Sequence, residues 1–534
     1  MAVTDRDEGA PLDDSQEFDD PSPIGEPEPP RVHEPTAEEL AVEAEAAEAA
    51  VEGDIASDVA LTDREAAAND AAETGRRRGR RDLARWSARG AAGVAALALG
   101  VGAVLGANAL PDDLRVASTA PSTLVQPASP LQSRVCAGPA LRVGTADGED
   151  ALAIAPLADA EVAIGSRGGE VTEAQLVVPS VEGLSGGDAI AQRGEASTLS
   201  AAQSLDVDVP AVAGFAASEC AETRLDQWLV GGSTRTGRQT VLTIANASEV
   251  GASVDVTVYG PDGPVESVGS TGLAIAPGTE TVLDLAAIAP GVADAVVHVA
   301  ASGAPVAAHL QQTTTRGLER GGFDVIDPVV IGTSAVLPGV RIDEPSGLET
   351  QTGFHDTVPV LRVLSPTGGA LRLAFQSGDG TVLKSQGELE AGIVTDFPLD
   401  ELPAGTLAIR VEADAPVVAG ARTVATSSEG LDFDWVAGGQ ARSGLSAIAV
   451  PPGPEATLHI VSLSDAEQQI TVDGEPLTIG ADGVLEQRVE PGSVEVEVEG
   501  EQLVIGVGYR SESEVGGFTA SPQGPAAEGV LVLH

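Results

Sequence analysis

The sequence predicts an all-β protein made of several tandem antiparallel β-sandwiches of immunoglobulin type, outside a membrane that one N-terminal helix crosses. Three observations predict this class. Short strands with alternating apolar residues follow residue 134, sequence motifs recur at the size of one sandwich, and an uncharged run occupies Gly90–Leu110. A disordered acidic tail is expected before that run.

Composition limits both the architecture and the partners. The 534 residues exceed one ordinary domain, so several domains are expected. Hydrophobic residues make up 43% of the chain but aromatic residues only 2%, so the cores must consist mostly of Val, Ala, Leu and Ile. The formal net charge of −52 argues against a nucleic-acid partner, because binding to phosphates requires clustered cations.

The charge falls into three blocks. Residues 1–75 carry a net charge of −20, residues 76–110 carry +6, and residues 111–534 carry −38. Charge blocks of this kind are more typical of a chain divided between cellular compartments than of a single globular fold. Since residues 1–75 also contain few large apolar groups, we expect them to form a disordered cytoplasmic tail.

The run Gly90–Leu110 is long enough to cross the membrane, for which about 20 apolar residues suffice. Arginines crowd the juxtamembrane segment 76–89, which places the N-terminus in the cytoplasm by the positive-inside rule. These arginines are Arg76, Arg77, Arg78, Arg80, Arg81, Arg85 and Arg89. The competing interpretation is a signal peptide cleaved after Ala109, but a leader with so long a cytoplasmic part would be unusual. Either interpretation exports the rest of the chain.

The exported part begins with a stalk, 111–134, rich in Pro, Ser and Thr. Beyond it, segments such as Ser253–Tyr259 and Ser493–Glu499 alternate apolar and polar residues, which predicts strands with one buried face. Gly, Pro and Asp separate these segments, as in Gly260-Pro-Asp-Gly263, and are typical of turns.

Internal repeats divide the strand-rich region. A Pro-Val type motif recurs with starts at Val209, Ala304, Ala415 and, in degenerate form, Leu503. This spacing predicts four β units and a tail. Their expected bounds are 135–218, 228–316, 331–425 and 435–512, with the C-terminal tail at 513–534 and one last strand at Val530–Leu533. The alternative is one or two larger β folds whose motifs resemble each other by chance.

Two tryptophans follow the motif at similar distances. Trp228 and Trp435 lie 18 and 19 residues after Pro210 and Pro416, and Gly-Gly follows each of them closely. We expect both indoles to be structural anchors buried at the start of a new unit. The functional alternative is a platform on which sugar rings stack.

Cys136 and Cys220 are the only cysteines, and both follow the predicted membrane segment. Because thiols tend to pair in exported proteins and two cysteines allow one intramolecular bond, we predict a Cys136–Cys220 disulfide that joins the ends of the first unit. The alternative is a reactive or intermolecular thiol, although no histidine is near either cysteine in the sequence.

The sequence predicts no catalytic, cofactor-binding or metal site. The histidines and cysteines form none of the usual zinc motifs. Gly183-Leu-Ser-Gly-Gly187 matches a hydrolase nucleophile motif, but that motif requires a strand–turn–helix context, and a glycine-rich turn is expected instead. The acidic segments Asp147–Asp150 and Asp432-Phe-Asp434 lack the ligand spacing of a calcium loop, so we expect solvated turns at both.

This layout resembles a family of actinobacterial membrane-anchored secreted proteins that is catalogued only as a domain of unknown function. The resemblance rests on the acidic tail, the Arg-flanked helix, Cys136 after the stalk, Cys220 with Trp228-Leu-Val-Gly-Gly232, and the Ala-Pro-Val strands. It covers most of residues 90–512. The resemblance implies a role in the envelope of a Gram-positive actinobacterium, and it supplies no activity and no catalytic residues.

Two functions follow as hypotheses. The first is a non-enzymatic scaffold or binding module of the cell envelope, held in the cell membrane through Gly90–Leu110 with most of the chain outside. Its partners would be the membrane and a wall polymer or another envelope protein, not nucleic acid. The second is an exported hydrolase of wall glycan or peptide, which would require convergent carboxylates or a nucleophile with its base in one groove.

Overall fold

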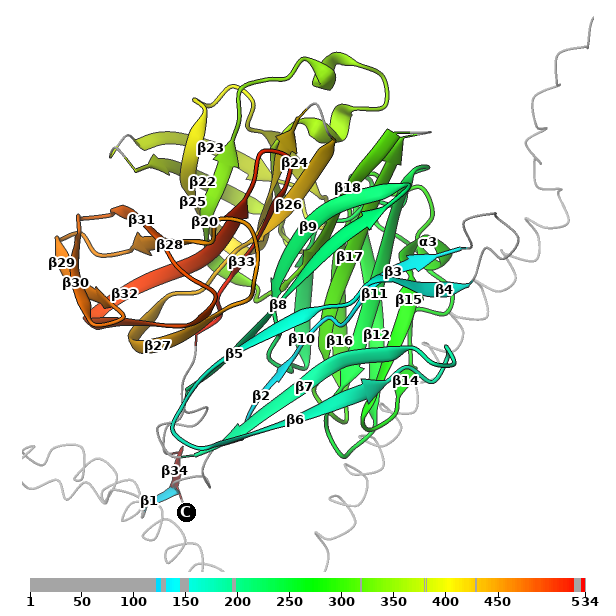
Figure 1. The fold of residues 1–534 in the computed structure, drawn as a ribbon, viewed down its shortest axis with the longest axis horizontal. Helices are drawn as coiled ribbons and strands as arrows, with labels where there is room; N and C mark the ends of the chain where they lie inside the picture. The colour runs from blue at the N-terminus through cyan, green and yellow to red at the C-terminus, as the bar shows by residue number, and fades with distance from the viewer. Residues whose placement is uncertain are drawn as a thin grey trace, which may run out of the picture. The chain divides into compact units, whose positions relative to one another are not determined.

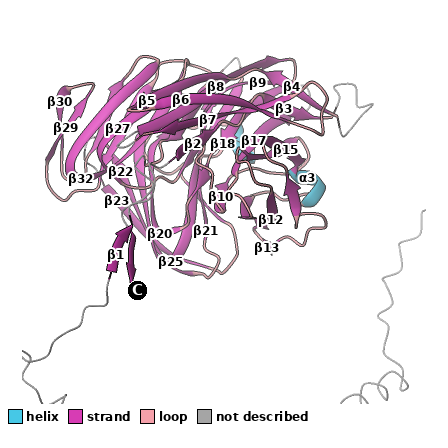
Figure 2. Ribbon diagram, turned by 90° about the horizontal axis from the view of Figure 1, so that it is seen from below, coloured by secondary structure: helices cyan, strands magenta, loops and turns pink. Residues whose placement is uncertain are grey.

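The fold is all-β, as the sequence predicts (Figure 2). The computed structural model describes residues 122–125, 131–144, 153–194, 198–316, 319–378, 380, 382–427, 430–522 and 530–533. Within these residues helical turns are confined to α3 (Leu285–Ile288), η3 (Leu348–Thr350) and η4 (His355–Thr357).

The strands form four consecutive blocks (Figure 1). Block 1 comprises β2 (Leu131–Val135), β3 (Ala140–Val143), β4 (Ile154–Ala158), β5 (Glu161–Arg167), β6 (Glu170–Val177), β7 (Ser185–Arg193), β8 (Thr198–Val209) and β9 (Val212–Glu219). Block 2 comprises β10 (Asp226–Val230), β11 (Arg238–Asn246), β12 (Ala252–Gly260), β13 (Gly263–Pro264), β14 (Leu273–Ile275), β15 (Thr279–Asp284), β16 (Val296–Ser302), β17 (Ala307–Arg316), β18 (Glu319–Ile326) and β19 (Pro328–Val329).

The other two blocks contain fewer, longer strands. Block 3 comprises β20 (Gly332–Ile342), β21 (Val360–Leu364), β22 (Gly369–Ser377), β23 (Val382–Leu389), β24 (Thr395–Pro398), β25 (Gly405–Thr426) and β26 (Leu431–Ala437). Block 4 comprises β27 (Arg442–Val450), β28 (Thr457–Ser462), β29 (Gln468–Val472), β30 (Glu475–Ile479), β31 (Val484–Arg488), β32 (Gly492–Arg510) and β33 (Val515–Thr519). Outside the blocks, β1 (Ser122–Val125) pairs antiparallel with β34 (Val530–Leu533), the last strand that the sequence predicts.

Blocks 2 to 4 repeat one topology. One sheet of each block has the strand order β15-β11-β17-β18, β24-β21-β25-β26 or β31-β28-β32-β33. The other sheet contains β12, β16 and β10 in block 2, β22, β25 and β20 in block 3, and β29, β32 and β27 in block 4. The long strands β25 and β32 therefore run through both sheets of their blocks, whereas block 2 uses two strands, β16 and β17.

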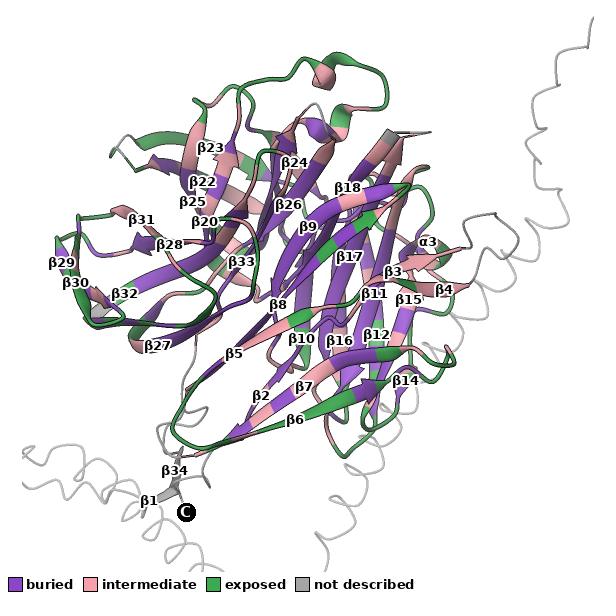
Figure 3. Ribbon diagram, viewed as in Figure 1, coloured by how far each residue is buried: buried purple, intermediate pink, exposed green. Residues whose placement is uncertain are grey.

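Alternating side chains place the cores between the paired sheets. In β12, Val254, Val256 and Val258 are buried while the residues between them are exposed or half-buried. These valines pack on Leu242 and Ile244 of the facing β11 in one large core. Figure 3 shows buried residues concentrated on strands such as β9, β17 and β18, and exposed residues along β6.

One strand near the end of each block packs on its counterparts in the neighbouring blocks. β9 contacts β18, β18 contacts β26, β26 contacts β33, and β33 contacts β9, so these four ring strands close a circle. β9 and β18 pair in parallel through Gly321 and Val212, and the first two blocks share one ten-stranded sheet. The ring therefore joins all four blocks into one body.

The ring strands lie at or beyond the expected unit ends. β18 falls in the predicted connector between 316 and 331, β26 straddles the predicted boundary near 425–435, and β33 lies inside the predicted tail 513–534. β2 likewise begins inside the predicted stalk 111–134. The ring strands are short and contain Gly and Asp, which are typical of turns, so the sequence pattern assigns them to connectors.

The first Pro-Val motif is not structurally equivalent to the others. The copies that start at Ala304 and Ala415 lead into or lie within the strand before the ring strand, in β17 and β25. The copy at Val209 lies in the hairpin between β8 and the ring strand β9 itself. The copy at Leu503 lies in β32, again in the strand before the ring strand, so the repeat is structurally equivalent in blocks 2 to 4 and its first copy is not.

The predicted tail 1–75, the juxtamembrane arginines of 76–89 and the predicted membrane helix Gly90–Leu110 lie outside the described residues. In the part of the chain that the structure describes, no helix has the length and apolar character needed to span a membrane.

Candidate functional site

The centre of the ring is held by a buried carboxylate. Asp432, on β26, is 1% exposed. One of its oxygens, Oδ2, accepts hydrogen bonds from the backbone amides of Phe215 (3.0 Å) and Val515 (3.1 Å), and Oδ1 accepts one from Phe323 (3.2 Å). This one side chain thus binds the other three ring strands, taking the place of the carbonyl acceptors that a regular sheet would supply.

Further carboxylates continue the same pattern along the ring. Asp324 accepts from the amide of Trp435 at 2.9 Å, Asp327 accepts from the amide of Glu219 at 2.9 Å, and both oxygens of Glu219 accept from the amide of Ser521 at 3.0 Å. Burial raises the pKa of Asp324 to about 7 and the pKa of Asp327 well above its usual value, against the opposing effect of these amide donors.

The acidic pair of β26 differs from the sequence prediction. Asp432-Phe-Asp434 was expected to form a solvated turn, yet both aspartates lie on a strand and are at most 3% exposed. Burial raises the pKa of Asp434 well above its usual value, and the neighbouring carboxylates of Asp324 and Asp432 raise it further. The prediction is wrong because the Asp432 carboxylate accepts hydrogen bonds from backbone amides of strands that are distant in the sequence. The residues near Asp432 in the sequence contain no sign of these contacts.

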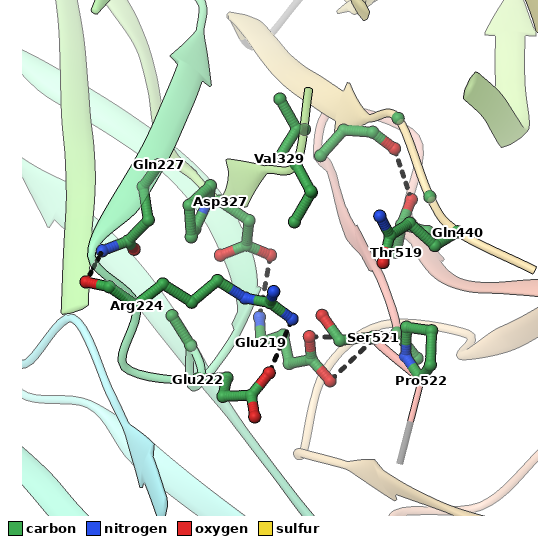
Figure 4. Close-up of a pocket in the computed structure, with 17 residues that line it drawn as sticks. Glu219, Glu222, Arg224, Gln227, Asp327, Val329, Gln440, Thr519, Ser521 and Pro522 are labelled. Atoms are coloured by element: carbon green, nitrogen blue, oxygen red, sulfur yellow. Dashed lines mark hydrogen bonds and ion pairs between the residues drawn. The ribbon is translucent and has the colours of Figure 1, made fainter. Parts of the chain in front are cut away.

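A pocket opens at the carboxyl ends of the ring strands, and we call it the axial pocket (Figure 4). Arg224 and Glu222 form an ion pair of 2.6 Å at its edge, while Glu219 and Asp327 lie beneath, engaged with backbone amides. The pocket holds only about 40 Å³. Small-molecule sites usually have volumes of several hundred Å³, so this pocket suits a few water molecules.

A larger cavity of about 370 Å³ lies between blocks 2 and 3, and we call it the interblock pocket. Its rim is formed by the turn before β11 and by η4. Here Asp356 binds two arginines, Arg238 at 2.8 Å and Arg316 at 2.7 Å. Burial alone would raise the pKa of Asp356, but the positive charges of Arg316 and Arg238 more than offset it and lower that pKa.

A fully buried arginine, Arg362, lies behind two aspartates that line the interblock pocket. The Arg362 guanidinium binds Asp396 with two parallel hydrogen bonds of 2.8 Å and Asp294 with one of 2.7 Å. Its remaining donor, Nη1, reaches the carbonyl oxygens of Gly232 and Ala295, each at 3.1 Å. All its nitrogens are therefore satisfied, and it joins three distant segments of the chain.

Two other arginines of this pocket form no ion pair at contact distance within the described residues, although the carboxylates of Asp356, Asp396 and Asp294 act on Arg422 from farther away. Arg422 is 7% exposed and donates to the Val358 carbonyl at 2.8 Å, but its Nε has no acceptor. Burial lowers the pKa of Arg422 to about 10, and the like charge of Arg362 contributes. Arg235 is exposed at the rim, and its guanidinium has no hydrogen-bond or ion-pair partner within the described residues.

The Cys136–Cys220 disulfide is confirmed. Both half-cystines are at most 1% exposed and pack with Ile190, Leu199 and Ala201. Cys220 directly follows the ring strand β9, and the amide of Cys136 donates to the carbonyl of Asp188 at 2.9 Å. The bond therefore ties the start of block 1 to the ring.

The two tryptophans occupy different structural positions. Trp228, 4% exposed, lies in the first strand of block 2 and stacks on His298 at 4.1 Å. Trp435, 2% exposed, lies in the ring strand of block 3, donates from Nε1 to Gln312 at 3.0 Å, and packs under the guanidinium of Arg362 at 4.6 Å. Both are buried, but the repeated position inferred for them is not found.

The remaining motifs form no reactive cluster in the described residues. Ser185 begins strand β7 after a turn that contains Gly183, whose φ of 82° suits glycine, so the motif precedes a strand and not a helix. Asp147–Asp150 lies outside the described residues. No group of three or more His, Cys, Asp or Glu arranged for a metal ion is found in the part of the chain that was described.

Comparison with known families decides the chain's classification. The Family of unknown function (DUF5719) matches residues 179–491, more than half of the chain. The chain belongs to this family. The DUF5719 match begins inside block 1 and ends before β32, so it covers part of blocks 1 and 4 and all of blocks 2 and 3, including the interblock pocket. No curated protein and no solved structure matches the chain.

Proposed function

We propose that this DUF5719 protein is a non-enzymatic binding module of the cell envelope in a Gram-positive actinobacterium. It is held in the cell membrane by Gly90–Leu110 and presents four immunoglobulin-like blocks outside the cell. The observation that carries the binding role is the interblock pocket, which has the volume of a small-molecule site and is lined by two arginines, Arg235 and Arg422, that form no ion pair at contact distance within the described residues.

The chemistry of the ring supports binding over hydrolysis. The buried carboxylates of Glu219, Asp327 and Asp432 accept hydrogen bonds from backbone amides. They therefore hold the blocks together. An exported hydrolase of wall material remains the second candidate. In the interblock pocket its acid and base would be the carboxylates of Asp294 and Asp396, which both bind Arg362.

The membrane and compartment assignments rest on sequence. The arginine-rich segment 76–89 precedes the uncharged run, and Asp112 and Asp113 follow it, which favours a cytoplasmic N-terminus. The buried disulfide agrees with an oxidising compartment for block 1.

Protease protection tests the proposal. Protease added to intact protoplasts should remove residues 111–534 and leave an epitope within residues 1–75 intact, whereas lysed cells should lose both. Digestion of the N-terminal epitope in intact protoplasts would overturn the orientation. Incubation of the purified protein with wall material should release no soluble fragments, and sustained release would favour the hydrolase.

A further inference from the structure

We propose that the interblock pocket binds an anionic sugar, meaning a monosaccharide unit that carries a carboxylate or a phosphate group. The pocket lies between the β10–β11 and β16 connections of block 2 and the η4, β24 and β25 segments of block 3. Its volume of about 370 Å³ lies within the range of small-molecule sites.

Charge favours an anion at this place. Five arginines lie in the pocket or directly behind it, and three aspartates accompany them. The arginines are Arg235, Arg238, Arg316, Arg362 and Arg422, and the aspartates are Asp294, Asp356 and Asp396. The formal net charge of these eight side chains is therefore +2, in a chain whose formal net charge is −52. Elsewhere such an acidic chain repels anions, so a local excess of cations marks a specific site.

The cationic excess is available to a ligand. Asp356 is shared by Arg238 and Arg316, and the other two aspartates bind Arg362. Arg422 and Arg235 have no carboxylate of their own. Arg422 is more than nine-tenths buried and its Nε has no acceptor, which is costly unless a ligand or water supplies one. An oxyanion between Arg422 and Arg235 would supply charge-assisted hydrogen bonds to both.

Two lining aspartates supply acceptors for hydroxyl groups. Asp294 and Asp396 are partly exposed, with side chains 35% and 21% accessible, and each carboxylate has more acceptor sites than Arg362 uses. A ligand with one anionic group and several hydroxyls therefore complements both the arginines and the aspartates, whereas a simple inorganic anion would use mainly the arginines. A neutral sugar could offer Arg422 a hydroxyl acceptor but no negative charge.

The source of the sugar rests on the proposed function: on the outer face of a Gram-positive cell, it would belong to an acidic envelope polymer. The pocket's chemistry does not depend on that location. If the full chain binds acidic sugars but protease protection fails, the ligand class stands and the compartment is wrong. If protection succeeds and acidic sugars do not bind, the envelope proposal stands and this inference is wrong.

Titration calorimetry on the purified full-length chain tests the inference, with glucuronic acid, glucose 6-phosphate, glucose and inorganic phosphate as probes. We expect both acidic sugars to bind at least about tenfold more tightly than glucose and phosphate, because they alone combine a negative charge for the arginines with several hydroxyls for the aspartates. Binding should weaken with added salt. Equal affinity for glucose would overturn the anionic requirement, and equal affinity for phosphate would overturn the sugar requirement.

Matched variants locate the site. Arg235→Gln should weaken binding of glucose 6-phosphate by roughly tenfold without changing the melting temperature, because this exposed side chain has no partner to lose. Arg372→Gln removes the same charge from an exposed arginine of block 3 that pairs with Asp414, and should leave affinity unchanged. If Arg235→Gln binds like the wild type, or both variants weaken binding equally, the ligand does not bind in this pocket.

Discussion

The carboxylate of Asp432 accepts a hydrogen bond from the backbone amide of Phe215, a residue that precedes it by 217 positions in the chain. The contact joins the last strand of block 1 to the last strand of block 3, which are not consecutive blocks. It shows how the ring is closed: side-chain carboxylates, and not only backbone carbonyls, pair the amides of neighbouring ring strands.

Replacing Asp432 by Asn should destabilise the protein by roughly 2–4 kcal/mol, because one amide oxygen cannot accept from all the backbone donors that both carboxylate oxygens serve. The free energy of unfolding from urea titration measures the effect. Asp465→Asn, at an exposed position of block 4, is the matched control and should change stability little. Equal effects of the two substitutions would show that the ring does not depend on this carboxylate.

Gly214→Ala should have a comparable cost for a steric reason. A Cβ atom at Gly214 would lie 2.3 Å from Oδ1 of Asp432 and 2.8 Å from the backbone nitrogen of Phe323, so the ring strands would have to separate. The expected loss is roughly 1–3 kcal/mol, typical of overpacking. Gly480→Ala, where no atom lies within 4 Å of the added Cβ, is the control. A wild-type melting temperature for Gly214→Ala would contradict the close approach.

Removing the disulfide should lower stability by roughly 3–5 kcal/mol, because the bond restricts a long loop of the unfolded chain, closed by cysteines at a sequence separation of 84. Thermal unfolding of the Cys136→Ser/Cys220→Ser variant, compared with wild type in the presence and absence of reductant, measures the effect. Reductant should lower the melting temperature of the wild type and leave that of the variant unchanged. A wild type insensitive to reductant even after complete reduction would rule out a stabilising role.

Glu280 should make stability depend on pH. Burial raises its pKa to about 7 although the Gly187 amide donates to it, whereas an unfolded glutamate titrates near 4.5. The protonated side chain is therefore favoured in the folded state. Its contribution is fully present below about pH 4.5 and is lost as the pH rises through 7, by on the order of 3 kcal/mol in total.

Glu280→Gln keeps an acceptor for the Gly187 amide and removes the titration. The variant should match the wild type near pH 4.5 and exceed it in unfolding free energy above pH 7. Urea titrations at both pH values measure the difference, and Glu344→Gln at an exposed position should show none. A constant difference between Glu280→Gln and wild type at every pH would contradict the raised pKa.

Much of the sheet structure follows from the sequence, because apolar and polar residues alternate along a strand that exposes one face to solvent. The prediction for Ser253–Tyr259 corresponds to β12, whose alternate residues are buried. The disulfide was predictable because two cysteines in a segment that the sequence predicts to be exported allow one intramolecular bond. Such inferences need only neighbouring residues or simple counting.

The ring and the interblock pocket could not be predicted in this way. Gly322, Asp432 and Asp434 have the composition of turns, and their role appears only when strands from four blocks converge. The partners of Arg362 are equally remote, since Asp294 lies 68 residues away in the loop before β16 of block 2 and Asp396 lies 34 residues away in β24. A single sequence contains no periodicity that brings these residues together.

The closed circle of β9, β18, β26 and β33 has a consequence for the order in which the protein can mature. The ribosome makes β9 first and β33 last. The side of β9 that packs on β33 therefore has no partner until nearly all of the chain has been synthesised. A nascent chain that stops before Val515 would lack both the last member of the circle and one donor to Asp432. Premature termination near the C-terminus is therefore expected to leave even the N-terminal block open to proteolysis, although every residue of that block is present.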